Sequence, residues 1–340
     1  MEVTFLQNIW FILIGVLLIG YAILDGFDLG VGILQFFTKN DKDRRILINS
    51  IAPFWDGNEV WLLTGGGALF AAFPHAYATV FSGFYLALIL LLVGLIFRAV
   101  CMEFRGQVES DSWKHFWDKA FNFSSFLITL LLGVALGNIF VGIPLGADMN
   151  YTGSFFTLLR PVPVVIGLTG VFMFIMQGAI YLTMKTEGDL HNSSIKWAKN
   201  SWRLFIIALA LTTVLVAVLE ADKFSLFISR WGAYPVLAIM IISLVMIIPS
   251  INKGKFFQAF LFSSLTIASM FLIVALTIYP NIVPATDPAM HMAISRVSAS
   301  EYTLQSMFIV ALIGVPIMLV YTTYVYRIFK GKVKLDEHSY

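Results

Sequence analysis

Residues 8–36 read NIWFILIGVLLIGYAILDGFDLGVGILQF, an apolar run that two aspartates interrupt near its end. A helix that crosses a membrane needs about 20 apolar residues, so this run is long enough to span the bilayer. It is too long for the hydrophobic region of a signal peptide, and residues 1–8 lack the basic segment that precedes such a region. We therefore expect it to remain in the protein as a first membrane span.

The rest of the chain has the same apolar character. Of its 340 residues, 59% are hydrophobic and 12% are charged, whereas soluble domains carry about 25% charged residues. Apolar runs separated by polar interruptions predict an all-α integral membrane protein with a single domain, residues 1–340, and about nine transmembrane helices. The predicted spans are 8–36, 49–73, 75–97, 121–143, 161–184, 204–219, 232–250, 256–279 and 304–326.

The basic residues indicate how these spans are oriented. Loops on one side of the nine-span arrangement carry most of the 22 Lys and Arg residues, and the other side carries Arg160, Lys223, Arg230 and Arg296. Because cytoplasmic loops are enriched in Lys and Arg, we expect the N-terminus outside and the C-terminus in the cytoplasm. A net charge of +2 gives no reason to expect nucleic acid as a partner.

Four acidic residues fall inside predicted spans: Asp25 and Asp28 in the first, and Asp56 and Glu59 in the second. Each pair is spaced i, i+3, so its two carboxyls share one helix face. A charged group inside a membrane is costly and needs either a partner or a function. Two explanations remain open. The acids could take up protons from the cytoplasm, because all four lie in the cytoplasmic half, or they could pair with a cation such as Arg98.

Haem ligation would need His, Met or Cys at mid-membrane depth. The histidines all fall in loops or at span ends, and no two of them face each other across a bundle. We therefore expect no haem and no metal site in this chain. The histidines are His75, His115, His191, His291 and His338.

Two further patterns predict local packing. Gly26, Gly30 and residues 65–67 are glycines inside spans, where small residues allow helices to approach closely. Residues 111–119 combine three aromatic rings with two lysines, which predicts an amphipathic helix on the inner membrane surface.

Two motifs carry a resemblance to a known family. They are DGFDLGVG, residues 25–32, and NSIAPFWDGNEVWL, residues 49–62. Both resemble the signature of subunit II of cytochrome bd quinol oxidases, and a thinner similarity continues over essentially the whole chain. Five further residues lie near the candidate acids and are expected to support them. Two of the five, Asn58 and Trp61, can donate a hydrogen bond to a carboxylate. The five are Trp55, Gly57, Asn58, Trp61 and Arg98.

The resemblance implies an arrangement and an activity. It implies two four-helix bundles plus a peripheral helix in a bacterial cell membrane, paired with a subunit I that holds two haem b groups and haem d. The complex would oxidise quinol at the outer face and reduce dioxygen to water with cytoplasmic protons, without pumping. This chain alone would not be catalytic. In the family, the acid that matches Asp56 is associated with a proton path along the subunit interface.

The resemblance also concerns further partners. Small accessory subunits, membrane lipid and quinone are expected around such a complex, and some relatives hold a structural quinone in this subunit. No cofactor-binding residue of this chain follows from that similarity. The predicted outer loop 220–231 is short compared with some family members, so contacts made by a longer loop are not expected here.

Two other functions remain open on the sequence. A secondary transporter often has ionisable residues near mid-membrane, but the second half of this chain has no counterpart of Asp25 or Asp56. A membrane partner with a purely structural role would need no titratable carboxyl. Haem that copurifies with the chain would favour the oxidase subunit over the transporter.

Overall fold

The computed structural model describes residues 3–335, and its long elements are all helices. The first half contains α1 (Phe5–Leu34), α2 (Asp41–Ile51), α3 (Trp55–Ala72), α4 (Pro74–Gly83), α5 (Tyr85–Arg105), α6 (Asp111–Val141) and α7 (Pro161–Lys185). The second half contains α8 (Gly188–Leu219), α9 (Ala221–Ser229), α10 (Ala233–Asn252), α11 (Phe256–Ile278), α12 (Ile294–Val297) and α13 (Glu301–Ile328). The described chain also contains two short antiparallel strands, β1 (Asn281–Val283) and β2 (Met292–Ala293). It has three 3-10 turns: η1 (Gln35–Phe37), η2 (Phe155–Leu158) and η3 (Pro288–Met290).

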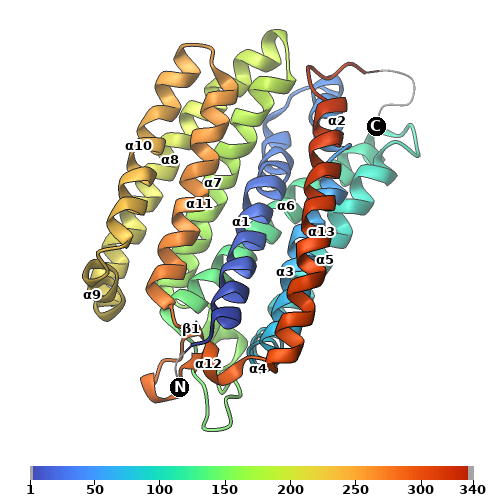
Figure 1. Cartoon of the computed structure of the whole chain (residues 1–340). Helices are drawn as coiled ribbons and strands as arrows, with labels where there is room; N and C mark the ends of the chain where they lie inside the picture. The colour runs from blue at the N-terminus through green and yellow to red at the C-terminus, as the bar shows by residue number, and fades with distance from the viewer. Residues whose placement is uncertain (1–2, 336–340) are drawn as a thin grey trace.

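The long helices run side by side between two ends of the molecule (Figure 1). The short elements α4, α12 and β1 lie at one end, where α1 begins, and α2 lies at the other. By the distribution of basic residues, the end with α2 is expected in the cytoplasm. We refer to it below as the cytoplasmic end, and to the opposite end as the outer end.

The prediction of an all-α membrane protein is confirmed. Within the described residues, eight helices are long and apolar enough to cross a membrane: α1, α5, α6, α7, α8, α10, α11 and α13. The remaining long helix, α3, has 18 residues, which at 1.5 Å per residue spans about 27 Å and approaches the thickness of a bilayer core. Its first turn is polar, and its role as a ninth span stays a prediction, as does the grouping into two bundles.

Several predicted boundaries were wrong. The predicted span 49–73 is divided at residues 52–54 between α2 and α3, where Pro53 disfavours a continuous helix. The predicted span 75–97 is divided at Phe84 between α4 and α5. There the ring of Tyr151, from the loop after α6, packs onto Gly83, where a Cβ would lie 2.7 Å from it.

Two segments expected outside the spans are helical continuations of them. Residues 188–203, predicted as part of a cytoplasmic loop, are the first half of α8, and residues 111–119, predicted as a separate surface helix, are the first turns of the 31-residue α6. A 31-residue helix is about 46 Å long, well beyond the hydrocarbon core. These helices therefore extend past the membrane boundary, and their polar ends are helical although they are not buried in lipid.

Helix α1 lies among α3, α6, α7 and α11. Its glycines bring it close to α7, since a Cβ on Gly30 would collide with the carbonyl of Phe174 in α7. Gly178, also in α7, lies against Gly30. Gly26 lies against the Phe174 ring, so close packing at both predicted positions of α1 is confirmed. The expectation fails for Gly66 and Gly67 of α3, where added Cβ atoms would meet open space.

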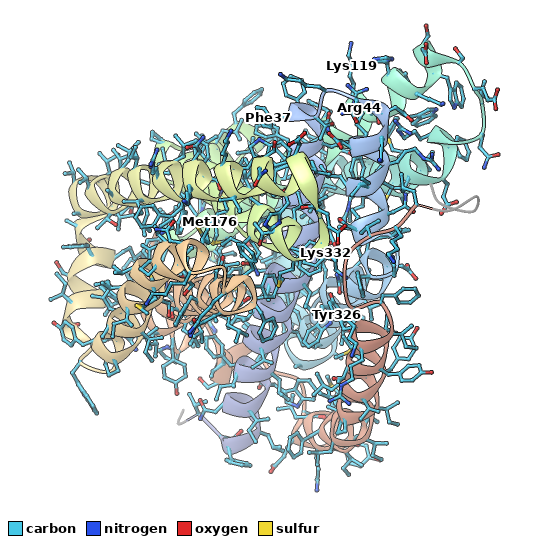
Figure 2. The ribbon with its side chains drawn as sticks, turned by 90° about the horizontal axis from the view of Figure 1, so that it is seen from above. Phe37, Arg44, Lys119, Met176, Tyr326 and Lys332 are labelled. Carbon is cyan, nitrogen blue, oxygen red and sulfur yellow. The ribbon has the colours of Figure 1, made fainter. Side chains whose placement is uncertain are left out.

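Helix α13 lies on the outside of the bundle and contacts it along one face, with hydrogen bonds near its two ends. Of its described residues, Leu304 alone is buried, and its carbonyl accepts a hydrogen bond from Trp10 Nε1 at 3.0 Å near the outer end. After α13, residues 329–333 form a C-terminal strap along the end of α7. Lys185 Nζ donates to the Phe329 carbonyl at 2.6 Å, and Lys332 Nζ donates to the carbonyls of Thr183 and Thr186. Figure 2 labels Lys332 and, in α13, Tyr326.

Candidate functional site: a buried acid and arginine cluster

Asp25 and Arg98 form the centre of the site. Asp25 lies on α1 and Arg98 on α5, and both side chains are completely buried. The guanidinium and the carboxylate bind through two parallel hydrogen bonds, Nη1 to Oδ2 at 2.8 Å and Nη2 to Oδ1 at 2.6 Å. Bidentate pairing of this kind is the strongest geometry available to an arginine and a carboxylate. The structural pairing that the sequence left open is therefore present for Asp25.

Asp28 is held differently. Its Oδ2 accepts a hydrogen bond from Asn58 Nδ2 at 2.7 Å and lies 3.9 Å from Arg98 Nη2. Its second oxygen, Oδ1, is buried without a hydrogen-bond partner among the described residues. Buried polar atoms usually have a partner, with ordered water included. Asp28 is thus the least satisfied acid of the cluster.

Tyr326 of α13 extends this network, and sequence reasoning did not find it. Its hydroxyl donates to Asn58 Oδ1 at 3.0 Å, so a chain of hydrogen bonds runs from Tyr326 through Asn58 to Asp28. The ring of Tyr326 stacks on Phe54, with centroids 4.4 Å apart. Tyr326 follows Asn58 by 268 residues, and no local pattern in a sequence relates two positions that far apart.

Glu59 links the cluster to the surface of α3. Its Oε1 lies 3.3 Å from Arg98 Nη1, and its side chain is 21% exposed. One guanidinium therefore faces the carboxyls of Asp25, Asp28 and Glu59, and the cluster has more acidic groups than basic ones. Burying uncompensated charge is costly, and one guanidinium cannot compensate three carboxylates.

Asp56 lies one turn before Glu59 and faces outward. The cation that was considered for it, Arg98, is occupied by Asp25 and Glu59, and within residues 3–335 Asp56 takes part in no ion pair given by the structure. A structural pairing of Asp56 with Arg98 is therefore wrong. Gly57 beside it is exposed, with open space around its α-carbon.

The two tryptophans of the motif have packing roles within this chain. Trp61 is 8% exposed, and its ring packs so tightly against Gly20 of α1 that a Cβ there would overlap the indole. The expected hydrogen bond from Trp61 to a carboxylate is not among the contacts of the described chain. Trp55 is half-buried against the main hydrophobic core. The Trp61 ring therefore helps to fix α3 against α1.

A second polar cluster lies nearer the cytoplasmic end and was also missed. Asp118 of α6 accepts from Arg105 Nε at 2.7 Å, from Arg44 at 3.2 Å and from Gln35 at 3.0 Å. Arg105 also donates to Asp41 at 2.6 Å. Burial alone would raise the pKa of Asp41, but the hydrogen bond and the charge of Arg105 outweigh it and lower the pKa. These contacts fasten α2 to α5 and α6.

Possible metal or haem ligands do not gather at either cluster. Within residues 3–335, no group of three His, Cys, Asp or Glu side chains has the arrangement of a metal site. His291 lies in the outer loop, where its Nδ1 accepts a hydrogen bond from the Ala285 amide at 3.0 Å. His338 lies outside the described residues.

Comparison with known proteins agrees with the motifs. A family model for cytochrome bd terminal oxidase subunit II matches residues 6–329. The chain belongs to this family. Members of the subunit II family are components of a quinol oxidase, so the chain is a subunit of an oxidoreductase complex that contains haem, quinol and a partner subunit I. The alternative of an independent transporter is not favoured.

Relatives of this subunit II come from distant bacteria. It is 38% identical to the cytochrome bd-I ubiquinol oxidase subunit 2 of Escherichia coli, with 98% of each chain covered, and 33% identical to cytochrome bd ubiquinol oxidase subunit 2 of Bacillus subtilis, again over 98% of each chain. A solved structure titled as the bd oxidase from Geobacillus thermodenitrificans has the same fold, with a TM-score of 0.81 at 16% identity over 96% of this chain and 99% of that one.

Proposed function

We propose that this subunit II carries protons from the cytoplasm toward the oxygen-reducing site of its partner. In this proposal, the partner subunit I holds two haem b groups and haem d, quinol is oxidised at the outer face, and dioxygen is reduced without proton pumping. The chain itself contributes carboxyls and no haem. The observation that carries the proposal is the placement of Asp56 and Glu59 on successive turns between the surface of α3 and the buried Asp25, Asp28 and Arg98.

The exposed face of α3 supports a protein partner over it. Val60, Leu63 and Phe70 are 42%, 73% and 59% exposed on the same side of the helix as Asp56 and Gly67. A carboxylate that faced lipid at this depth would be costly, whereas one at a protein interface can reach water or polar groups. Glycine positions on this face leave room for close helix approach or for water. We therefore infer that subunit I covers this face.

The charge arrangement supports a role for protons. A single guanidinium compensates one carboxylate fully, so each further proton taken up by Asp28 or Glu59 reduces the net buried charge. Carboxyl groups at such positions are suited to accept and release protons near neutral pH. Arg98 keeps the group together, and Asp56 is the acid that is free to move at the surface. Proton transfer would then proceed along the face of α3, with Arg98 as a fixed counter-charge.

Replacement of Asp56 by Asn tests the proposal. The substitution keeps size and hydrogen-bonding capacity but removes the titratable group, and no ion pair within the described chain depends on it. Oxygen consumption per haem should fall at least about tenfold, since a positioned acid typically contributes that much or more to proton transfer. Haem content and copurification of subunit I should stay normal.

A surface acid away from this face provides the matched control. Glu109, exposed in the loop between α5 and α6, becomes Gln with the same loss of one carboxyl, and turnover per haem should not change. Full turnover in an assembled Asp56→Asn complex would refute the proton path. A variant that loses haem and subunit I together would instead assign Asp56 to assembly, which also contradicts the proposal.

A further inference from the structure

A small hollow lies between the cytoplasmic ends of α8 and α10, two helices that contribute no residue to the acid cluster. It has a volume of about 190 Å³ and is lined by Lys199, Trp202, Arg203, Ile248 and Asn252. Three of these side chains are cationic or amide donors, and the other two are apolar. This combination suits a ligand with an anionic head and an apolar remainder.

The hollow is at the depth of lipid headgroups. Arg203 directly precedes the apolar run 204–219 of α8, and Asn252 is the last residue of the apolar α10. Trp202 is the residue type that gathers at the boundary between hydrocarbon and headgroups. A ligand in the hollow would therefore have its charged part at the inner membrane surface.

The cations of the hollow have no acidic partner. Lys199 and Arg203 are spaced i, i+4 on α8, a spacing at which like charges repel, and neither forms an ion pair given for residues 3–335. Residues 190–219 and 231–278 contain no Asp or Glu at all. The nearest acid of α8, Asp189, precedes Lys199 by ten residues, or about 15 Å along the helix. An external anion would relieve this repulsion.

One wall of the hollow, the Trp202 indole, is fixed before any ligand arrives. Trp202 Nε1 donates to the Leu244 carbonyl of α10 at 2.9 Å, which locks the indole across the gap between the two helices. On the lipid side, Leu204 and Val245 are 46% and 57% exposed and continue the apolar surface away from the hollow. A preformed site loses less conformational entropy when it binds a ligand.

We propose that this hollow binds the phosphate headgroup of an anionic phospholipid from the cytoplasmic leaflet. Lys199, Arg203 and the Asn252 amide contact the phosphodiester, while the acyl chains follow Ile248 and the exposed apolar faces of α8 and α10. Basic pockets between membrane helices on the cytoplasmic side recognise such lipids through this chemistry. The single negative charge of the bound phosphodiester offsets one of the two positive charges and reduces their repulsion, and the lipid joins two helices that lie away from the acid cluster. The site is independent of the proposed proton path.

Native mass spectrometry of the intact, detergent-purified oxidase tests this proposal, with phosphatidylglycerol as the probe and zwitterionic phosphatidylethanolamine for comparison. The test variant is Lys199→Gln with Arg203→Gln. The control variant is Lys196→Gln with Lys253→Gln, which removes the same charge from exposed residues at the same end that do not line the hollow. Haem content and turnover should be normal in both variants, because neither pair touches the acid cluster.

The wild type should retain phosphatidylglycerol in preference to phosphatidylethanolamine. The test variant should bind phosphatidylglycerol about 30-fold more weakly, since each cation near the surface contributes about a factor of five to ten, and the control variant should bind as the wild type does. Equal losses in both variants would reduce the effect to general surface charge and overturn the proposal. Equal retention of the two lipids, or displacement of phosphatidylglycerol by inorganic phosphate at the same concentration, would overturn it as well.

Discussion

Arg98 is the residue on which the buried acids depend. It is completely buried, binds Asp25 with two hydrogen bonds and lies within 3.9 Å of Asp28 and 3.3 Å of Glu59. Removing one partner of a buried ion pair leaves an uncompensated charge, which usually costs more than the pair itself contributes. The three acids therefore differ in what their loss should do, according to how each contacts the guanidinium.

Asp25→Asn should destabilise the complex by about 3–5 kcal/mol, because it breaks the bidentate pair and leaves Arg98 with weaker contacts. Asp28→Asn should be milder, since Asp28 lies 3.9 Å from the guanidinium and the new amide can still bond to Asn58. Thermal unfolding of the purified complex, followed by haem absorbance, measures the difference. Equal stability of the two variants would show that the pair with Arg98 is not the main contact of Asp25.

The sequence identified the acids and the cation near them, but not which of the acids the cation binds. The i, i+3 spacing and the polar motif named Asp25, Asp28, Asp56 and Glu59 as candidate acids and Arg98 as a possible counter-charge. The structure brings three of these acids to Arg98 and leaves Asp56 at the surface. Tyr326 could not be found, because it is one of several aromatic residues on an apolar helix. Which surface acid pairs with Arg98 could not be decided either, since helix rotation is set by packing that no local pattern reports.

The helix crossing of α1 and α7 is the closest approach between elements around the site. A methyl group on Gly30 would overlap the Phe174 carbonyl, and backbone cannot move aside as a flexible side chain can. The crossing holds the segment of α1 that carries Asp25 and Asp28. Its tolerance to added volume is therefore expected to be low.

Gly30→Ala should lower the stability of the complex by about 1–3 kcal/mol through overpacking. Gly15→Ala in the same helix is the control, because a Cβ at Gly15 has no heavy atom within 4 Å. Resistance to unfolding in increasing detergent or heat, compared between the two variants and the wild type, is the measurement. A Gly30→Ala complex as stable as the Gly15→Ala complex would contradict the tight crossing.

The outer loop between β1 and β2 should respond to pH through His291. Burial, with the charge of Lys223, lowers the pKa of His291 from its ordinary value of 6.5, and the neutral ring accepts the Ala285 amide. The neutral form is thus favoured by folding, so its contribution to loop stability is fully present above pH 6.5 and is lost as the pH falls through the lowered pKa.

Hydrogen exchange at the Ala285 amide checks this expectation, expressed as a protection factor so that the intrinsic pH dependence cancels. Protection should fall in the wild type as the pH is lowered below 6.5. In His291→Gln the side-chain oxygen can still accept the amide but does not titrate, so protection should be flat over the same range. A flat wild-type profile would exclude His291 as the titrating group.

At the scale of elements, apolar runs located the spans but misplaced several ends. Hydropathy reports where lipid surrounds a helix, and α6 and α8 continue as helices beyond that boundary. The break at residues 52–54 was missed because Phe54 and Trp55 keep the run apolar while Pro53 ends the helix. The outer connection at Phe84 depends on Tyr151, a residue from another loop, so no local signal marked it.

The whole molecule has a polarity that labelling can test. Connectivity places the loop after α6 and the turn between α10 and α11 at opposite ends, and the basic residues assign the first to the outside and the second to the cytoplasm. Asn150→Cys should react with a membrane-impermeant thiol reagent in intact cells, and Lys253→Cys should react only after lysis. The native Cys101 is buried and contributes little background. Labelling of Lys253→Cys in intact cells would invert the topology.

Composition, charge distribution and motif were sufficient for the fold class and the family, because both depend on features spread over the entire chain. The arrangement of helices around α1 was not accessible in this way. It depends on glycine contacts such as Gly30 with Gly178 and Gly133 with Gly167, and each pair joins helices whose individual sequences give no indication of the partner. The ninth span stayed a prediction because α3 combines the length of a span with the polarity of a site.

The hydrogen bond from Tyr326 of α13 to Asn58 has a consequence for biosynthesis. The ribosome makes this helix last among the described elements, and until it docks, Asn58 Oδ1 lacks the hydroxyl of Tyr326. The C-terminal strap, through Lys185 and Lys332, then fastens the helix in place. In a nascent chain without α13, the Asn58 amide that donates to Asp28 would lack the hydrogen bond from Tyr326. Completion of the acid cluster is thereby coupled to the synthesis and docking of α13, so a product truncated before α13 would not present the finished site to its partner.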